Sequence, residues 1–210
     1  MDSFSYPKPV RFPLGPRIEG KPYLREAELK KLLSSRLVVE EKMDGRQTII
    51  EIGNYVLCME DLKRTHSIKY RVPGRYALFD VFEMSSQTFL DRDAKLQFWE
   101  DLVRGRIEHS LKMLIFPVAC VSRPNALTLE QVPSLVRTSA YAIGDGGAPA
   151  LMEGVVVKVD GKLPPAERLA GKFVRQEFTD GITVSYLDRP ITYNIIDPSV
   201  PVKLTYEGGD

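Results

Sequence analysis

Cysteine and histidine are scarce in this chain of 210 residues, which contains two of each. Cys58 and Cys120 lie far apart in apolar stretches, so they match no metal-ligand spacing. We expect buried free thiols at these positions rather than a disulfide. The two histidines have no carboxylate at a suitable spacing and therefore offer no zinc site.

Long hydrophobic runs and a strong net charge are also absent. No window is apolar over the roughly 18 residues that a membrane span needs, and the first residues lack the pattern of a signal peptide. We therefore expect a cytoplasmic protein with no membrane partner. Because the net charge is only +1, binding of a nucleic acid has to rest on local clusters of charge. The clearest cluster consists of Lys63, Arg64, His66, Lys69, Arg71 and Arg75.

The content of hydrophobic residues, 43%, is enough for one sizeable core. The segment up to about Pro22 is rich in proline and glycine, and we expect an extended lead-in that packs on the domain. We predict that residues 1–178 form one domain. Residues 179–210 are too few to build a second core unaided, so this tail is expected to pack on the domain or on another chain.

The first third of the chain is predicted to contain a helix and then a meander of antiparallel strands. Charge and leucine spacing indicate a short helix over Leu24–Leu33. Gly53-Asn54 marks a turn between two alternating stretches. The meander is expected to deliver Lys42 and Glu60 to one sheet. Its strands are predicted at Leu37–Val39, Thr48–Ile52 and Tyr55–Cys58.

Helices and strands alternate in the rest of the chain. Apolar residues at helical spacing predict a helix over Ala94–His109, and a weaker helix is expected over Leu129–Val136, where Pro133 interrupts it. The loop at 144–149 is no Walker phosphate loop, because no Gly-Lys-Ser/Thr opens a helix after it. Strands are predicted at Met113–Val121, Gly154–Val159, Lys172–Phe178, Ile182–Tyr186 and Ile191–Ile196.

Lys42-Met43-Asp44-Gly45 is the most informative stretch of the sequence. A lysine placed just before Asp-Gly, after an apolar run, can present an amine nucleophile at the end of a strand, as covalent nucleotidyl transfer requires. The same four residues also suit a hairpin in which Asp-Gly turns the chain between two half-buried strands. The motif by itself leaves both interpretations open.

Five further segments follow Lys42 in a definite order. They are residues 59–62 (Met-Glu-Asp-Leu), 66–70 (His-Ser-Ile-Lys-Tyr), 76–83 (Tyr-Ala-Leu-Phe-Asp-Val-Phe-Glu), 153–158 (Glu-Gly-Val-Val-Val-Lys) and 171–175 (Gly-Lys-Phe-Val-Arg). Together they resemble the adenylyltransferase domain of ATP-dependent RNA ligases, within the superfamily that includes DNA ligases and mRNA capping enzymes. The resemblance runs from about Val38 to Phe178. It implies an α+β fold, the ATP-grasp-like nucleotidyltransferase domain, with antiparallel sheets flanked by helices around a nucleotide cleft.

The resemblance implies roles for the residues around the motif. Lys42 would become adenylylated, Asp44 would support the lysine and metal-bound waters, and Glu41 would help to read the adenine base. Gln47 matches the glutamine that follows the motif in RNA ligases and is expected to contact the nucleotide. Arg46 stands where that subset has a small residue; it either touches ribose or phosphate, or is solvated.

Two residues of the later segments are expected to hold the nucleoside. Glu60 matches the family glutamate that accepts a hydrogen bond from the ribose, a role that suits a carboxylate because ribose hydroxyls are donors. Phe79 matches the aromatic residue that stacks on adenine. Core packing is an equally good interpretation of Phe79, and Phe82 in the same segment is the competing choice.

The last two segments supply a carboxylate and two lysines. The family uses the glutamate at Glu153 for the metal, and a carboxylate there can hold a hard divalent cation. Lys158 and Lys172 are expected to be catalytic and to contact the phosphates. A free lysine has a pKa of about 10.4, so the site has to lower the pKa of Lys42; we expect Lys158, Lys172 and a metal on Glu153 to do so.

The implied function is that of a compact ATP-dependent RNA ligase with ATP and Mg²⁺ or Mn²⁺ as cofactors. It would form lysyl-AMP, pass AMP to an RNA 5′-phosphate and let a 3′-hydroxyl displace it. The alternatives are a ligase for DNA or nicked hybrids, a capping-type guanylyltransferase, and an inactive nucleotide- or RNA-binding module. The sequence indicates neither the oligomeric state nor a physical role for His66. Contacts with RNA are expected from Lys63, Arg64, Lys69 and Arg71.

Overall fold

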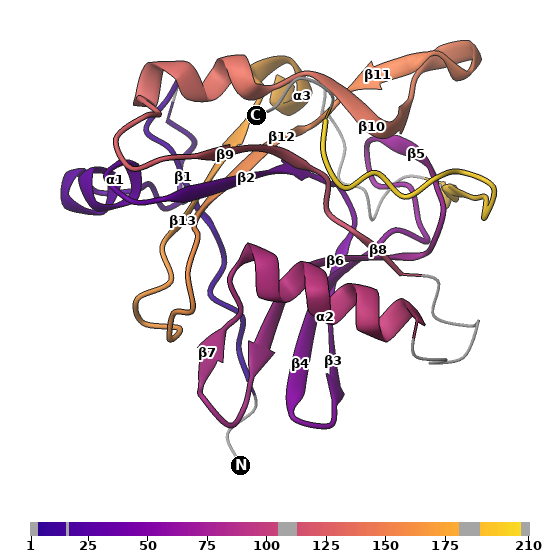
Figure 1. Ribbon diagram of the computed structural model, residues 1–210. Coiled ribbons are helices and arrows are strands. Elements are labelled where there is room, and N and C mark those ends of the chain that lie inside the picture. The colour runs from indigo at the N-terminus through magenta and orange to yellow at the C-terminus, as the bar shows by residue number, and fades with distance from the viewer. Residues whose placement is uncertain (1–3, 16, 105–112, 181–189, 207–210) are drawn as a thin grey trace.

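The computed structural model describes residues 4–15, 17–104, 113–180 and 190–206. Its strands form three sheets with few helices, which confirms the predicted α+β class (Figure 1). Each sheet also contains one parallel pairing, so the sheets are mixed rather than purely antiparallel. The helices are α1 (Glu26–Leu33), α2 (Arg92–Arg104) and α3 (Gln176–Asp180), with 3₁₀ turns η1 (Leu129–Leu135) and η2 (Asp145–Gly147).

The first sheet has the order β1-β13-β12-β2-β9, and its central strand β12 pairs antiparallel with both β2 and β13. Valines and leucines alternate along β2 and β12 and pack against α1 and η1 in one apolar core. Leu32 of α1 is completely buried there. The strands are β1 (Val10–Arg11), β13 (Ala170–Val174), β12 (Gly154–Val159), β2 (Leu37–Lys42) and β9 (Val118–Ser122).

The second sheet has the order β3-β4-β6-β7, and β8 pairs with β6 in parallel. Helix α2 covers one face of this sheet, where Trp99 packs on strand residues and donates a hydrogen bond to Met113 O at 3.2 Å (Figure 1). The predicted turn at Gly53-Asn54 is present, with Gly53 at a φ of +57°. The strands are β3 (Arg46–Ile52), β4 (Tyr55–Asp61), β6 (Tyr76–Glu83), β7 (Thr88–Phe89) and β8 (Met113–Ile115).

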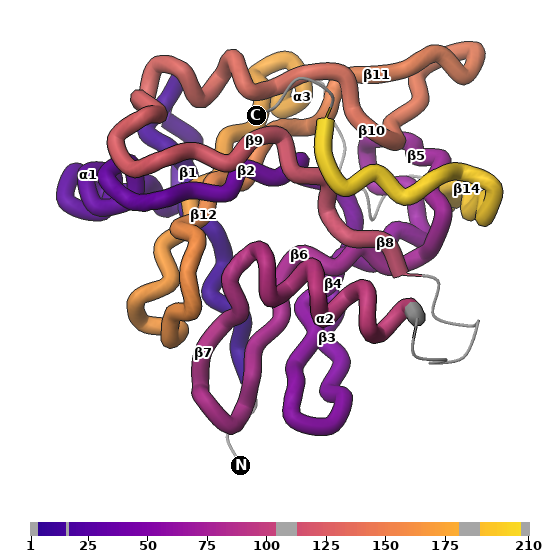
Figure 2. The backbone as a smooth tube through the Cα atoms, viewed as in Figure 1, coloured from indigo at the N-terminus to yellow at the C-terminus, as the bar shows by residue number. Residues whose placement is uncertain are grey.

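The third sheet has the order β11-β10-β5-β14 and joins the tail of the chain to its middle. Strand β14 pairs in parallel with β5, while Thr205 bridges Val118 and Lys203 N donates a hydrogen bond to Tyr141 Oη at 2.6 Å. Figure 2 shows this part of the tail, in yellow, running beside β5 and β9. The strands are β11 (Pro149–Leu151), β10 (Thr138–Ile143), β5 (Lys69–Val72) and β14 (Ile195–Ile196).

The predicted single strand Met113–Val121 is wrong, because it is two strands in different sheets. Strand β8 pairs with β6, and β9 pairs with β2. Between them lies Pro117, which has no amide hydrogen to give to a ladder and therefore ends the first strand. The expected delivery of Lys42 and Glu60 to one sheet is also wrong: Lys42 ends β2 of the first sheet, whereas Glu60 lies in β4 of the second.

Several helices and strands begin or end at other residues than predicted. The strand expected over Lys172–Phe178 ends at Val174, and Phe178 lies in α3. Helix α2 begins earlier than expected because Asp91 Oδ1 accepts the Ala94 amide at 2.8 Å. Leu129–Val136 is a 3₁₀ helix that ends at Leu135, and of Ile191–Ile196 only the last two residues form a strand. Residues 105–109 of the predicted helix and the predicted strand at 182–186 lie outside the described residues.

Both cysteines are free; Cys58 is buried as expected, whereas Cys120 is half-buried. In the described part of the chain, no helix combines the length and the apolar character that crossing a bilayer requires.

Candidate active site

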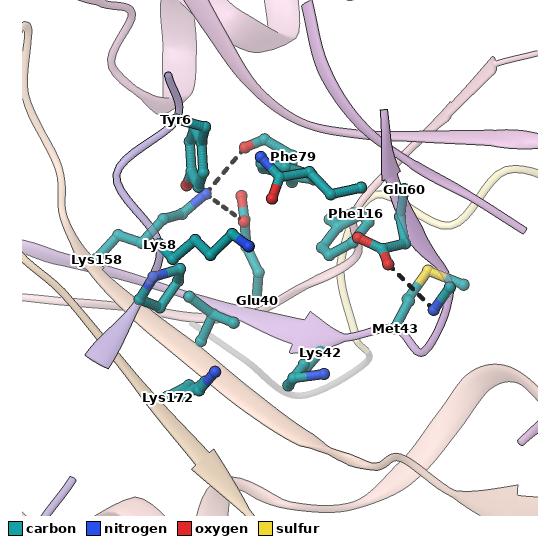
Figure 3. Close-up of a pocket in the computed structure, with 14 residues that line it drawn as sticks. Tyr6, Lys8, Glu40, Lys42, Met43, Glu60, Phe79, Phe116, Lys158 and Lys172 are labelled. Atoms are coloured by element: carbon teal, nitrogen blue, oxygen red, sulfur yellow. Dashed lines mark hydrogen bonds and ion pairs between the residues drawn. The ribbon is translucent and has the colours of Figure 1, made fainter. Parts of the chain in front are cut away.

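A cavity of about 280 Å³ lies where the first and second sheets face each other. The first sheet contributes charged side chains, and the second contributes a carboxylate, an amide and an aromatic ring. The N-terminal segment and the connections between strands complete the wall, as Figure 3 shows. The lining residues are Tyr6, Lys8, Pro9, Glu40, Lys42, Met43, Gly45, Gln47, Glu60, Phe79, Phe116, Val156, Lys158 and Lys172.

The alternation of β2 decides which of its acidic residues reaches the cavity. Side chains two residues apart lie on one face of a strand, so Glu40 lines the cavity together with Lys42. Glu41 is buried on the opposite face, where it accepts hydrogen bonds from Ser139 Oγ, Tyr206 Oη and the Ala140 amide. The side chain of Glu41 therefore does not line the cavity, and its expected contact with the adenine base stays a prediction.

Lys42 forms an ion pair with Glu153, with 2.6 Å between Nζ and Oε2. Desolvation lowers the pKa of Lys42, but the charges of Glu153, Asp44 and Glu60 outweigh it and raise the pKa above its ordinary value. The sequence-based expectation was a lowered pKa, and the ion pair is the reason for the difference. In this arrangement Lys42 is an ammonium ion.

Glu153 is brought to Lys42 by the pairing of β12 with β2, in which the next residue, Gly154, lies opposite Lys42. A Cβ atom at Gly154 would lie 1.9 Å from Phe173 O, so only glycine permits the spacing of β12 and β13 there. Glu153 is 5% exposed. Burial raises the pKa of its carboxyl above the ordinary value, and the charge of Asp44 adds to this; the charge of Lys42 acts in the opposite direction but is too weak to cancel the effect of burial. Lys172, on the neighbouring strand, has a lowered pKa through desolvation and the nearby charge of Lys42.

Asp44 and Gly45 form the crossing between the two sheets and are held by the segment after β4. The Asp44 carboxylate accepts the amides of Ser67 and Ile68 at 2.7 and 3.3 Å, so Asp44 does not line the cavity itself. The Gly45 amide donates to Glu60 Oε1 at 3.1 Å. A Cβ at Gly45 would lie 2.7 Å from Asp61 O, so close packing rather than a turn requires this glycine.

Glu60 and Gln47 are cross-strand neighbours at the end of the β3–β4 hairpin, and both line the cavity. Burial raises the pKa of Glu60 to about 7, and the negative charges of Asp44 and Glu153 add to this effect while Lys42 opposes it. At neutral pH the Glu60 carboxyl is therefore divided between its protonated and ionised forms.

Phe79 lies at an irregularity in β6. Cys58 pairs with Asp80 and Met59 with Leu78, so Phe79 is the extra residue of a bulge. The extra residue shifts the alternation by one position, which explains why Phe79 and Phe82 share one core. The Phe79 ring packs on Tyr6 and Phe116, with centroid distances of 5.0 and 5.5 Å.

The carbonyl of the bulge anchors a buried charge network below the cavity. Phe79 O accepts hydrogen bonds from both Lys95 and Lys158 at 2.9 Å. Glu40 pairs with the same two lysines. Asp80 pairs with Lys158 and Arg168 and accepts a hydrogen bond from Tyr6 at 2.5 Å. Burial alone would raise the pKa of Asp80, but Arg168, Lys158 and Lys95 lower it to about 2.

The four residues expected to contact RNA lie away from the cavity and are exposed. Lys69 and Arg71 share the exposed face of β5. Part of the charge is offset, because Arg71 pairs with Asp197 at 2.8 Å and Arg75 with Asp61 at 2.6 Å. The remaining residues of the expected set are Lys63 and Arg64.

Sequence reasoning missed several residues of the cavity and of the network below it. Glu40 could have been found from its spacing of two residues to Lys42. Tyr6 and Lys8 come from the lead-in segment, and Lys95 comes from a helix; no local pattern connects them to the motif. Among the described residues, no cluster of three or more histidine, cysteine, aspartate or glutamate side chains could hold a metal ion.

Comparison with known proteins gives a match at the level of structure. Variants of the Naegleria gruberi RNA ligase align with TM-scores of 0.52 (with AMP and Mn), 0.51 (with ATP and Mn) and 0.50 (with AMP and Mn). The sequence identities are 14, 11 and 12%. The chain shares the fold of these ligases.

The alignments cover 85, 74 and 74% of this chain but only 58, 54 and 54% of the ligase chains. This chain thus spans little more than half the length of the ligases it matches. No protein-family model matches the sequence, and no curated protein matches it.

Proposed function

We propose that this chain is an ATP-dependent RNA ligase of the covalent nucleotidyltransferase type, with Lys42 as its nucleophile. The observation that carries the proposal is the place of the Lys42 amine, at the end of β2 on the wall of a cavity that Glu60 and Phe79 also line. The fold shared with RNA ligase chains supports the same class of activity.

In the first step the neutral amine of Lys42 attacks the α-phosphorus of ATP. A nitrogen–phosphorus bond forms, the bond to the bridging oxygen of the β-phosphate breaks, and pyrophosphate leaves. The ammonium group of Lys42 has to release a proton to solvent first, and its ion pair with Glu153 opposes that loss by raising the pKa of Lys42. Nucleotide binding must therefore be coupled to neutralisation of the Glu153 carboxylate.

Mg²⁺ or Mn²⁺ suits this requirement, because hard divalent cations bind carboxylate and phosphate oxygens together. A cation held by Glu153 would neutralise the carboxylate that keeps Lys42 protonated and would stabilise charge on the phosphates. Lys172 lines the cavity and is assigned the contact with the α-phosphate. Lys158 supports the site from below through Glu40 and Asp80.

The nucleoside would occupy the side of the cavity formed by the second sheet. Phe79 and Phe116 offer aromatic surface for adenine, where a stacked base contributes about 1–3 kcal/mol. Glu60 is assigned the ribose hydroxyls, and Gln47 a polar contact beside it. In the later steps AMP would pass to an RNA 5′-phosphate, and a 3′-hydroxyl would displace it.

The test is incubation with ATP labelled at the α-phosphate and a divalent metal, followed by denaturing electrophoresis. We expect the wild-type protein to carry covalent AMP and Lys42→Ala to carry none, because alanine cannot form the phosphoramidate. Lys31→Ala on the exposed face of α1 is the matched control and should be labelled like wild type. Labelling of the Lys42 variant would show that the nucleophile lies elsewhere.

The same assay separates the alternatives. Labelling by GTP instead of ATP would identify a capping-type guanylyltransferase, and the absence of any adduct would favour an inactive binding module. Faster joining of DNA or nicked-hybrid ends than of RNA ends would identify a polynucleotide ligase.

The exposed basic residues give a second test of the proposal. Backbone phosphate contacts supply much of the affinity for nucleic acids and weaken with salt. We expect the combined replacement of these residues by alanine to slow RNA joining and flatten its salt dependence while AMP labelling stays unchanged. Equal loss of both activities in a folded protein would assign these residues to the nucleotide site instead. They are Lys63, Arg64, Lys69 and Arg71.

A further inference from the structure

A second hollow of about 590 Å³ adjoins the cavity. The two share Tyr6, Lys8, Gly45 and Gln47, so an occupant of one lies next to an occupant of the other. The second hollow is built from three separate parts of the chain: the N-terminal segment, the start of β3 and the segment after β4. Its lining residues are Phe4, Ser5, Tyr6, Lys8, Gly45, Arg46, Gln47, Ile49 and His66.

The described residues that line the second hollow include the cations Lys8 and Arg46 and no acidic residue. Among the described residues, neither Lys8 nor Arg46 has an ion-pair partner. Asp61 lies opposite Arg46 in the β3–β4 ladder, but Arg75 takes both of its carboxylate oxygens at 2.9 and 2.6 Å. Arg46 is thereby left available to another anion.

The chain fixes Lys8 on both sides while leaving its amine free to reach a ligand. Before it, Tyr6 donates to Asp80; after it, Val10 and Arg11 pair in parallel with β13, and Phe12 N donates to Lys172 O at 3.1 Å. The side chain of Lys8 is exposed, and Figure 3 shows its amine pointing into the first cavity. Lys8 therefore stands at the boundary between the two hollows.

We propose that the second hollow is a phosphate-binding site and that Lys8 and Arg46 are its charged contacts. A guanidinium matches phosphate oxygens with two parallel donors, and a lysine adds a compact charge. The inference rests on the proposed function, which puts the α-phosphate at Lys42 in the adjoining cavity. Two sources of phosphate fit: the pyrophosphate part of ATP, and the 5′-phosphate of a polynucleotide end.

The location accounts for two residues that the motif left unexplained. Arg46 lies directly after Gly45, and His66 opens the segment whose amides hold Asp44. Both line the second hollow rather than the first cavity. The arginine at position 46, where the usual motif has a small residue, thus places a cation in the hollow that adjoins the cavity of Lys42.

The experiment measures equilibrium binding by calorimetry with two probes, inorganic pyrophosphate and a short RNA with a 5′-phosphate; the same RNA with a 5′-hydroxyl is the reference. We expect Lys8→Ala and Arg46→Ala each to weaken at least one phosphate probe by roughly tenfold, the effect of losing one charge-assisted hydrogen bond of about 1.5 kcal/mol. Lys31→Ala should bind both probes like wild type.

The pattern of losses identifies the source. Weaker pyrophosphate binding alone would assign the hollow to the leaving group of ATP. Loss of the preference for 5′-phosphate over 5′-hydroxyl RNA would assign it to the polynucleotide end. Wild-type binding of both probes by the double variant Lys8→Ala/Arg46→Ala would overturn the proposal. Binding needs no AMP transfer, so a wild type that binds the probes without AMP labelling would refute the proposed function and leave this site standing.

Discussion

Asn194 is a buried residue of the tail that holds together the segment following β4, and its replacement by alanine gives a sharp test of the structure. Its Nδ2 donates to Leu62 O at 2.7 Å and to Arg64 O at 3.2 Å. Its Oδ1 accepts from Tyr70 N at 2.9 Å and from Thr65 Oγ1 at 3.0 Å. One side chain thus makes four hydrogen bonds.

The magnitude follows from which partners could turn to water. Arg64 is exposed and Thr65 half-buried, whereas Leu62 and Tyr70 are completely buried. In Asn194→Ala, the Leu62 carbonyl and the Tyr70 amide would lose partners inside the protein. Each such orphan costs about 1–3 kcal/mol, so we expect the loss of both partners to lower the free energy of unfolding by roughly 2–6 kcal/mol.

Urea denaturation of wild type and Asn194→Ala measures this loss as a shift of the midpoint at an unchanged slope. Asn54→Ala is the control. Among the described residues, the Asn54 side chain bonds only the exposed Ser85 hydroxyl, so its effect should stay within about 0.5 kcal/mol. A loss below about 1 kcal/mol for Asn194→Ala would refute the argument, since it would mean that the two buried groups keep partners.

Two further predictions concern the site itself. Because the pKa of Glu60 is raised to about 7 in the folded protein, chiefly by desolvation, the unfolded chain loses the proton of Glu60 at lower pH than the folded one. The free energy of unfolding of the wild type should therefore fall, relative to that of Glu60→Gln, as pH rises from about 4.5 to about 7. Stability curves that run parallel over this range would contradict the raised pKa of Glu60. Gly154→Ala should destabilise the fold by about 1–3 kcal/mol or more, because its Cβ would meet Phe173 O at 1.9 Å. Gly161→Ala should change the thermal midpoint little, because a Cβ atom there would lie 3.7 Å from its nearest neighbour. Equal effects of the two substitutions in a melting assay would show that β12 and β13 can move apart at position 154 without loss of stability.

Local patterns predicted the elements that carry the motif, but not how these elements face one another. The strand that ends at Lys42 and the hairpin turning at Gly53 follow from alternation and turn residues. The split of Met113–Val121 was also readable, because Pro117 cannot donate within a ladder. Glu40 was readable as well, because it lies two residues before Lys42 and therefore on the same face of the strand. The alternation does not tell, however, that the second sheet faces these two residues.

The residues missed by sequence reasoning depend on contacts between distant parts of the chain. Lys95 meets Glu40 across 55 positions, and Arg168 meets Asp80 across 88. Local periodicity carries no information on such pairs. The bulge at Phe79 connects the two pairs, because the Phe79 carbonyl accepts from Lys95 and the next residue, Asp80, pairs with Arg168. It becomes visible only when β4 and β6 are aligned.

The two walls of the cavity belong to different sheets, and the crossing at Met43, Asp44 and Gly45 connects them directly (Figure 1). Each wall has a separate apolar core packed behind its sheet. Leu32 lies behind the first wall and Trp99 behind the second. Because protein cores are close-packed, a larger or smaller side chain at either position would shift the sheet in front of it. Such a shift would alter the fit of a nucleotide that neither residue contacts.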